Sequence, residues 1–265
     1  QQAKQIEEYY KQCADEGATE EDIRKSKEAM SSLNIILGDP ERQNKLAVDI
    51  INHYDRFCDE QPDLVQKAMI VCSDRKIAYG LYKLIAKYRP EWVEPRKAMN
   101  ESELGAEDLE KLEAVPFVNL IATRERNDEK EMYDALGDKD NRKHLAELFK
   151  DDKSNFRIAI VVDMWITGFD APCLSVLYND KPLQKHTLIQ TISRVNRKYK
   201  TKEYGLIVDY IGIRKNMQEA LKKYGGDDVV GGDDLGTVHE TFHNELQILK
   251  DLMNKYDFTN FFEGS

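Results

Sequence analysis

The sequence predicts an α/β protein built on a parallel β-sheet with helices on both faces. Short apolar runs rich in Val, Ile and Leu alternate with amphipathic helical segments along most of the chain. These runs are continuous rather than alternating with polar residues, which is typical of strands buried on both faces. The chain is also large enough for a substantial core, with 265 residues of which 41% are hydrophobic. Each strand–helix–strand crossover should be right-handed.

The first part of the chain is expected to hold helices and one strand. Residues 1–35 are polar and have a helical composition, and Gly38-Asp39-Pro40 forms a break. A helix is predicted over residues 41–59, where apolar side chains recur at helical spacing. The apolar run 68–72 predicts a strand. A second helix should begin at an N-cap in Ser73-Asp74 and end at Pro90.

The strand–helix alternation resumes in the second half. Residues 91–115 are polar, and we expect their acidic block, Glu101 to Glu113, to be a solvated insertion. Strands are predicted over residues 117–122, 157–162, 174–178 and 204–210, and helices over 142–149, 184–197 and 213–224.

Four regions follow from this pattern. Residues 1–64 form a helical lead-in and residues 65–224 the α/β domain, with flanking helical segments on both sides. Residues 225–236 are a flexible acidic linker rich in Gly and Asp. Residues 237–265 begin a helical region whose apolar stripe either packs within the chain or forms a partner surface.

Composition limits the possible functions. No run of 18 apolar residues occurs, so no membrane span is expected. The net charge is −10, whereas free-standing DNA-binding domains are usually basic, so any contact with DNA requires a local patch or an assembly. None of the four cysteines forms a C-x-x-C pair, and none has a histidine at zinc-ligand spacing, so we expect no metal site and a reducing compartment.

Two segments carry the chemistry. Val162 ends a predicted strand, so the loop from Asp163 to Asp170 should lie at the carboxyl edge of the sheet, where open α/β sheets bind ligands. Gln190, Arg194 and Arg197 follow at i, i+4 and i+7, on one stripe of a helix. Arginine offers a planar fork of donors that matches phosphate oxygens. Together the segments predict one wall of a nucleotide-phosphate site, although a capped turn and a solvated basic face are the alternatives.

These segments resemble motifs V and VI of superfamily 2 helicases and translocases. Residues 190–197, QTISRVNR, are similar to the pattern Q-x-x-G-R-x-x-R, with Ser193 in place of glycine, and residues 162–170 resemble motif V. The strand at 68–72 with Ser73 lies where motif IV is expected. The sequence from MWITGFDAPCL to ISRVNR resembles the motor (R) subunit of type I restriction enzymes more closely still, and that resemblance covers about residues 40–225.

The resemblance implies a second RecA-like motor domain and assigns roles to individual residues. Arg194 and Arg197 would act as arginine fingers on ATP held by the first RecA-like domain, supported by Gln190. Asp170 and Gly168 would lie at the nucleotide. The residues expected to contact DNA are Ser73, Thr123, Arg124 and Thr167.

The chain lacks the other half of an ATPase. No glycine is followed by lysine, so no G-x-x-x-x-G-K-[ST] phosphate loop exists, and no Asp-Glu pair ends an apolar strand to hold Mg²⁺. A convincing nuclease motif is absent too. From these absences we expect the chain to be inactive alone. The resemblance implies that it is a C-terminal fragment of a cytoplasmic prokaryotic enzyme that uses ATP and Mg²⁺ to translocate and cleave double-stranded DNA.

The resemblance also implies partners. These are the first RecA-like and nuclease domains of the same subunit, and the modification and specificity subunits of the complex. Two alternatives remain open: the second motor domain of another superfamily 2 helicase or remodeller, and a non-catalytic interaction module with the same fold.

Two other features allow more than one interpretation. Lys198, Lys200 and Lys202 extend the arginines into a basic cluster that either contacts phosphate or is simply solvated. Trp165, in the loop before Asp170, either stacks on a base or packs against the protein.

Overall fold

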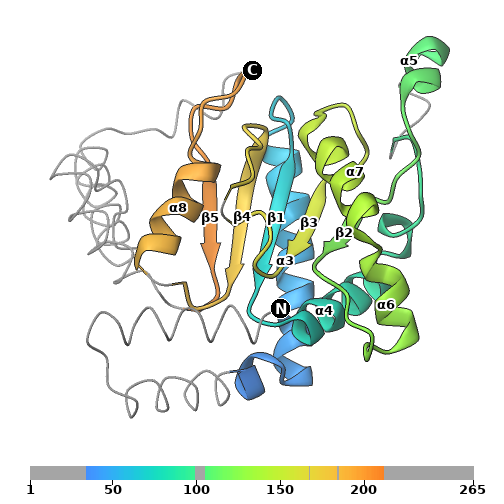
Figure 1. Cartoon of the computed structure of the whole chain (residues 1–265). Coiled ribbons are helices and arrows are strands. Elements are labelled where there is room, and N and C mark those ends of the chain that lie inside the picture. Colours follow the sequence, from blue (N-terminus) through green and yellow to red (C-terminus); the bar gives the residue numbers. More distant parts are fainter. Residues whose placement is uncertain (1–33, 99–104, 167, 184, 212–265) are drawn as a thin grey trace, which may run out of the picture. The chain divides into compact units, whose positions relative to one another are not determined.

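A five-stranded, all-parallel sheet forms the centre of the protein (Figure 1). The computed structural model describes residues 34–98, 105–166, 168–183 and 185–211. The strand order is β2-β3-β1-β4-β5. The strands are β1 (Lys67–Cys72), β2 (Val118–Ile121), β3 (Ile158–Val161), β4 (Leu174–Asp180) and β5 (Leu206–Asp209). The predicted α/β fold with a parallel sheet is confirmed, and every predicted strand is present.

The starts of the first two described helices follow from capping chemistry. Helix α3 (Pro40–Glu60) begins after Asp39, whose carboxylate accepts a hydrogen bond from the backbone N–H of Arg42 at 2.9 Å. Helix α4 (Arg75–Tyr88) begins after Asp74, whose carboxylate accepts from the backbone N–H of Lys76 at 2.7 Å. Proline in the first turn of α3 loses no hydrogen bond there, because that N–H has no partner within the helix. The predicted N-cap and the predicted end before Pro90 are both confirmed.

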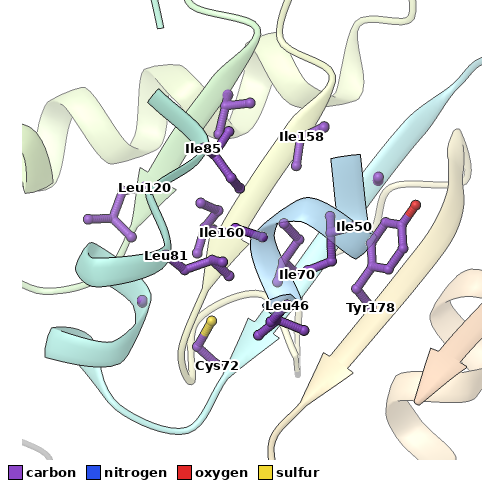
Figure 2. Packing of buried hydrophobic residues seen from close by; sticks show 14 of the residues in the cluster. Leu46, Ile50, Ile70, Cys72, Leu81, Ile85, Leu120, Ile158, Ile160 and Tyr178 are labelled. Atoms are coloured by element: carbon purple, nitrogen blue, oxygen red, sulfur yellow. The ribbon is translucent and has the colours of Figure 1, made fainter. Parts of the chain in front are cut away.

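One face of the sheet is covered by α3, α4 and the short helix α6 (Lys130–Leu136). Alternate strand side chains point to this face, as the two-residue period of a strand requires. Figure 2 shows Ile70 of β1 and Ile160 of β3 meeting Leu46 and Ile50 of α3 and Leu81 of α4. All of these side chains are buried, so truncating one such as Leu81 to alanine should cost about 2–5 kcal/mol.

The opposite face is covered by α7 (Lys139–Lys150) and α8 (Lys185–Val195). Strand residues of the other parity, Met69 and Val71 of β1 among them, point to this face. The middle of this layer is aromatic: Phe149 of α7 lies 4.9 Å, centroid to centroid, from Phe156. The two layers place the loop after β3 and the helix after β4 on the same side of the sheet.

The region between α4 and β2 is polar but contains one buried aromatic side chain. The short helix α5 (Ala106–Lys111) lies within the acidic block, Glu101 to Glu113, for which a solvated insertion is expected. Trp92, in the 3₁₀ turn η1 (Pro90–Trp92), is nevertheless only 4% exposed. Its ring lies 5.0 Å from Phe117 and 5.8 Å from Tyr54. A polar average over the segment concealed this buried side chain.

Several predictions concern residues beyond the described part. The lead-in helix over 1–33, the helix over 213–224, the linker 225–236 and the helical region 237–265 lie outside the described residues. Helix α6 was not predicted from the sequence, because seven residues are too few for a clear helical period.

Candidate nucleotide-phosphate site

The loop between β3 and β4 is anchored by its own aromatic side chains. In the motif V loop (residues 162–170), Trp165 and Phe169 stack at 4.2 Å with an angle of 12° between their rings. Both are buried, and Trp165 also lies 5.3 Å from Phe149 of α7. Trp165 therefore packs within the protein, as one of its two sequence interpretations held. The anchored loop gives the polar residues beside it a defined position.

Two residues of this loop have left-handed backbone angles. Gly168 has φ of 74° and is exposed, and a Cβ there would meet no heavy atom within 4 Å. Trp165 has φ of 70°, which is uncommon for a bulky residue. Stacking on Phe169 offers a physical reason why tryptophan tolerates this conformation. Thr167, between them, lies outside the described residues.

The side chain of Arg194, in the last turn of α8, binds backbone carbonyl oxygens of the motif V loop. Its Nε donates to the carbonyl oxygen of Ile166 at 3.2 Å, and its Nη1 donates to that of Phe169. The guanidinium thus spans the turn that contains Gly168. It also forms the polar wall of a small apolar crevice lined by Met69, Trp165, Phe169, Leu177 and Thr191.

The prediction that Arg197 lies on the same helix as Gln190 and Arg194 is wrong, because α8 ends at Val195, two residues earlier. Arg197 nevertheless pairs with the last residue of the loop. Its Nη1 lies 2.5 Å from the Oδ1 of Asp170. Both side chains are accessible, 41% and 60% exposed respectively, so an incoming anion could reach them. Gln190 lies one helical turn before Arg194 on α8 and is partly buried. The structure therefore brings together Gly168, Asp170, Arg194 and Arg197.

The residues predicted to contact DNA lie at the carboxyl ends of two strands. Ser73 directly follows β1, and Thr123 and Arg124 follow β2 closely. These strands are separated in the sheet by β3. The Arg124 guanidinium lies 4.3 Å from the centre of the Tyr133 ring, a cation–π contact. The Ser73 Oγ is buried with no hydrogen-bond partner among the described residues.

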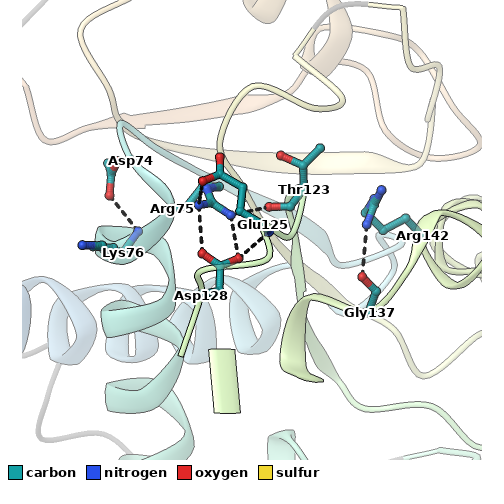
Figure 3. Close-up of polar contacts among 8 residues, drawn as sticks. All are labelled: Asp74, Arg75, Lys76, Thr123, Glu125, Asp128, Gly137 and Arg142. Carbon is teal, nitrogen blue, oxygen red and sulfur yellow. Dashed lines mark hydrogen bonds and ion pairs between the residues drawn. The ribbon is translucent and has the colours of Figure 1, made fainter. Parts of the chain in front are cut away.

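An arginine that sequence reasoning missed joins these two strand ends. Figure 3 shows Arg75, the first residue of α4, between Thr123, Glu125 and Asp128. Its Nη1 donates to the Thr123 carbonyl oxygen at 2.7 Å and to Asp128 at 2.8 Å, and its Nη2 lies 3.0 Å from a Glu125 carboxylate oxygen. The Asp128 carboxylate also accepts from the Glu125 backbone N–H. We call Arg75 with these partners the Arg75 clamp.

The charge state of the Arg75 clamp is well defined. Burial alone would raise the pKa of the Asp128 carboxyl, but the hydrogen bonds from Arg75 and from the Glu125 backbone hold that pKa below its ordinary value. Asp128 is therefore ionised at neutral pH and fixes the guanidinium of Arg75. Only its position after a predicted N-cap could have singled out Arg75.

The lysine cluster after α8 matches neither sequence interpretation fully. Lys200 pairs with Asp152. Lys202 is buried, 3% exposed, with its amino group directed to backbone carbonyl oxygens. A lysine in that position is not part of a solvated charge run, nor is it placed to meet a phosphate.

The described residues show neither a metal cluster nor a membrane-spanning helix. No three His, Cys, Asp or Glu side chains among them are grouped so that they could hold a metal ion. No described helix combines the length and apolar character that crossing a bilayer needs.

Comparisons with known proteins identify the family. The family model described as Type I restriction enzyme subunit R domain 3 matches residues 4–212. The type I restriction enzyme HindI endonuclease subunit of Haemophilus influenzae is 34% identical over 222 residues, which is 82% of this chain and 19% of that subunit. The SsaAORF53P endonuclease subunit of Staphylococcus saprophyticus is 48% identical over 68 residues, 25% of this chain and 7% of that subunit.

Solved structures give weaker likenesses. Bacteriophage T4 UvsW has a TM-score of 0.41 at 13% identity, covering 73% of this chain and 28% of that one. Yeast Dbp5 L327V bound to RNA and ADP BeF3 has a TM-score of 0.42 at 18% identity, covering 71% and 37%. The match of the family model to most of the chain is decisive, and the chain belongs to the R subunit family of type I restriction enzymes.

Proposed function

We propose that this chain supplies motifs IV to VI of an ATP-driven motor that moves double-stranded DNA in a type I restriction system. One observation carries the proposal: Arg194 and Arg197 both bind the loop that ends at Asp170. Two guanidinium groups, one of them accessible, then lie beside a sheet edge that suits nucleotides. Family membership supports the same role.

The proposed role of the arginines is electrostatic. A guanidinium that is fixed before the reaction stabilises negative charge as it builds on a transferred phosphoryl group. Arg197, whose partner Asp170 is itself exposed, would exchange that carboxylate for a phosphate oxygen. Arg194, held on two carbonyl oxygens, would keep the loop and Gly168 in place beside it. Gln190 would support both from the preceding turn.

The remaining parts of the ATP site would come from outside this chain. The sequence holds no phosphate loop, and its described residues offer no cluster of carboxylates for Mg²⁺. ATP and Mg²⁺ would therefore bind mainly to the first RecA-like domain, and this domain would complete the site on closure. Bound Mg²⁺ would supply charge neutralisation at the phosphates.

DNA contacts would lie at the carboxyl ends of β1 and β2. Thr123, Arg124 and, beyond the described residues, Thr167 are the candidates for the phosphate backbone. Ser73 is a candidate only if its loop rearranges, because its Oγ is buried. The Arg75 clamp supports this assignment, since it fixes the Thr123 loop relative to the start of α4. A local patch of this kind is compatible with the acidic net charge of −10.

The whole protein would extend well beyond this chain, which spans about a fifth of the length of the HindI subunit. Cleavage would belong to a nuclease domain of the same subunit. DNA recognition and methylation would belong to the specificity and modification subunits, in the cytoplasm of a prokaryote.

ATP turnover in the full-length subunit tests the proposal. Arg197→Ala should lower kcat by about 10²-fold or more, because it removes charge stabilisation in the transition state. Arg194→Ala should lower kcat too, because it releases the motif V loop that Arg194 holds through the carbonyl oxygens of Ile166 and Phe169. Arg56→Ala is the matched control, since Arg56 is an exposed arginine on α3, which covers the opposite face of the sheet. Wild-type turnover in Arg197→Ala would refute the arginine-finger role of Arg197.

A further inference from the structure

Lys202 uses its whole amino group to join three backbone carbonyls. Its Nζ donates to the carbonyl oxygens of Pro172 at 2.8 Å, Leu174 at 2.6 Å and Val195 at 3.0 Å. An ammonium group has three protons, so none remains for a ligand. Burying a charged side chain is costly unless its hydrogen bonds are made, and here they all go to the backbone.

The Val195 contact is at the carboxyl end of α8. Carbonyl groups in the last turn of a helix have no partner within the helix, and a positive charge is favoured there. The same oxygen of Val195 also accepts from the backbone N–H of Arg197, at 2.9 Å. One carbonyl oxygen is therefore shared by the Lys202 ammonium and by the backbone of the proposed finger.

Gly205 packs against the same residue, Val195, and constrains its position independently of Lys202. A Cβ on Gly205 would lie 2.4 Å from the Val195 carbonyl oxygen and 2.3 Å from its Cγ1. Real Cβ atoms do not approach other atoms so closely, so only glycine lets the chain return against the end of α8. Val195 itself is fully buried, so it cannot move aside without disturbing the core.

The other two carbonyls link Lys202 to the motif V loop. Pro172 and Leu174 follow Asp170 by two and four residues, at the entry to β4. Lys202 thus ties the segment leaving Asp170 to the segment leading into Arg197. Asp170 and Arg197 are the two partners of the exposed ion pair.

We propose that Lys202 and Gly205 are positioning residues that set the place of Arg197 relative to the motif V loop. The inference rests on the proposed function of Arg197, because it assigns Lys202 and Gly205 a role only through that arginine. Neither residue would touch ATP. A displacement of about 1 Å in a group that acts on the transition state can cost about 10²-fold in rate, so the effect should appear in turnover rather than in binding.

Lys67 provides a matched control. It is also fully buried, and its Nζ donates to the carbonyl oxygens of Phe156 at 2.6 Å and Leu148 at 3.4 Å. These groups belong to the end of α7 and the entry to β3, not to α8. Lys67→Met and Lys202→Met each remove one buried amino group, but only the latter releases the end of α8.

A double-mutant cycle in the full-length subunit tests the inference. We expect Lys202→Met to lower kcat about tenfold with less than about a twofold change in the KM for ATP, and Lys67→Met to leave both nearly unchanged at temperatures where all variants are folded. In an Arg197→Ala background, Lys202→Met should cost no further turnover, because its effect passes through the missing arginine. Gly205→Ala should behave as Lys202→Met does.

The outcomes separate this inference from the proposed function. Wild-type turnover in Arg197→Ala alone would refute the finger role and this inference with it. Two outcomes would overturn only the positioning role, given that Arg197→Ala itself loses turnover. In one, Lys202→Met and Lys67→Met lower kcat equally. In the other, the loss of kcat in Lys202→Met adds fully to the loss in Arg197→Ala. If Lys202→Met does not fold, Lys202→Arg keeps the charge and alters the geometry, and the same cycle applies to it.

Discussion

The carboxylate of Asp170 and the guanidinium of Arg197 form an ion pair between residues 27 positions apart, and this pair connects the motif V loop to the end of α8. Each partner follows an anchored segment. Asp170 follows the stacked rings of Trp165 and Phe169, and Arg197 follows Val195, whose carbonyl oxygen accepts from both Lys202 and the Arg197 backbone. The anchors are buried and the pair is exposed. This arrangement suits a contact that is exchanged for a ligand more than one that stabilises the fold.

Asp170→Ala should accordingly have little effect on stability. The pair is 41% and 60% exposed, and exposed ion pairs contribute about 0–1 kcal/mol because solvent screens them. Urea unfolding of the 265-residue chain should show a loss below about 1 kcal/mol. A loss above about 2 kcal/mol would mean that the pair is structural.

Arg75→Ala should lower the free energy of unfolding much more than the same substitution at an exposed arginine. The variant leaves the Asp128 carboxylate, 5% exposed, without its guanidinium, and breaking a buried pair costs about 3–5 kcal/mol. Arg89→Ala is the control, because Arg89 pairs with Asp55 where the two are 37% and 39% exposed. Similar unfolding free energies for the two variants would contradict the clamp's role in ordering the Thr123 loop.

Two glycine-to-alanine changes should have opposite signs. At Gly168, φ of 74° makes alanine unfavourable by about 1–2 kcal/mol although the space is open. At Gly80, inside α4, the space is also open and no left-handed angle occurs, so alanine should stabilise by about 0.5–1 kcal/mol. Thermal unfolding of both variants measures this difference, and shifts of Tm in the same direction would contradict it.

The buried Lys67 should make stability depend on pH. Burial, with a contribution from the charge of Arg157, lowers the pKa of Lys67 from 10.5 to about 7. Between those values the unfolded chain holds a proton that the folded chain lacks, so stability rises with pH, by up to about 1.4 kcal/mol per pH unit. Below about pH 7 the cost of burying the charge is present in full.

Comparing Lys67→Met with the unmodified chain isolates this effect. Between pH 7.5 and pH 9.5 the free energy of unfolding of the unmodified chain should increase relative to that of the variant, since methionine has no proton to lose. Parallel pH profiles for the two proteins would show that Lys67 does not titrate in this range.

The sheet could be predicted from the sequence because its strands are strongly patterned. Residues 68–72 and 158–161 are continuous runs of apolar side chains, and burial on both faces allows few other arrangements. Helical spacing singled out Gln190, Arg194 and Arg197, although α8 ends at Val195 and Arg197 reaches Asp170 from the segment after the helix. Trp92 and α6 were missed because their signals are one side chain and seven residues long.

The positions of single charges could not be predicted in the same way. Lys202 stands in a run of alternate lysines and has no feature in the sequence that marks it as buried. Its environment depends on carbonyl groups of Pro172 and Val195, which come together only in the folded chain. Arg75 likewise depends on a loop about fifty residues further along. Long-range polar contacts of this kind follow from the topology, not from local pattern.

The central claim is that Arg197 acts on the transition state of ATP hydrolysis. The most direct measurement compares nucleotide binding by the full-length subunit and by its Arg197→Ala variant, using ATP and using ADP with aluminium fluoride as a mimic of the transferred phosphoryl group. The account predicts that the Kd for ATP changes less than about threefold while affinity for the mimic falls at least about tenfold. Equal changes for both ligands, or none for the mimic, would contradict it.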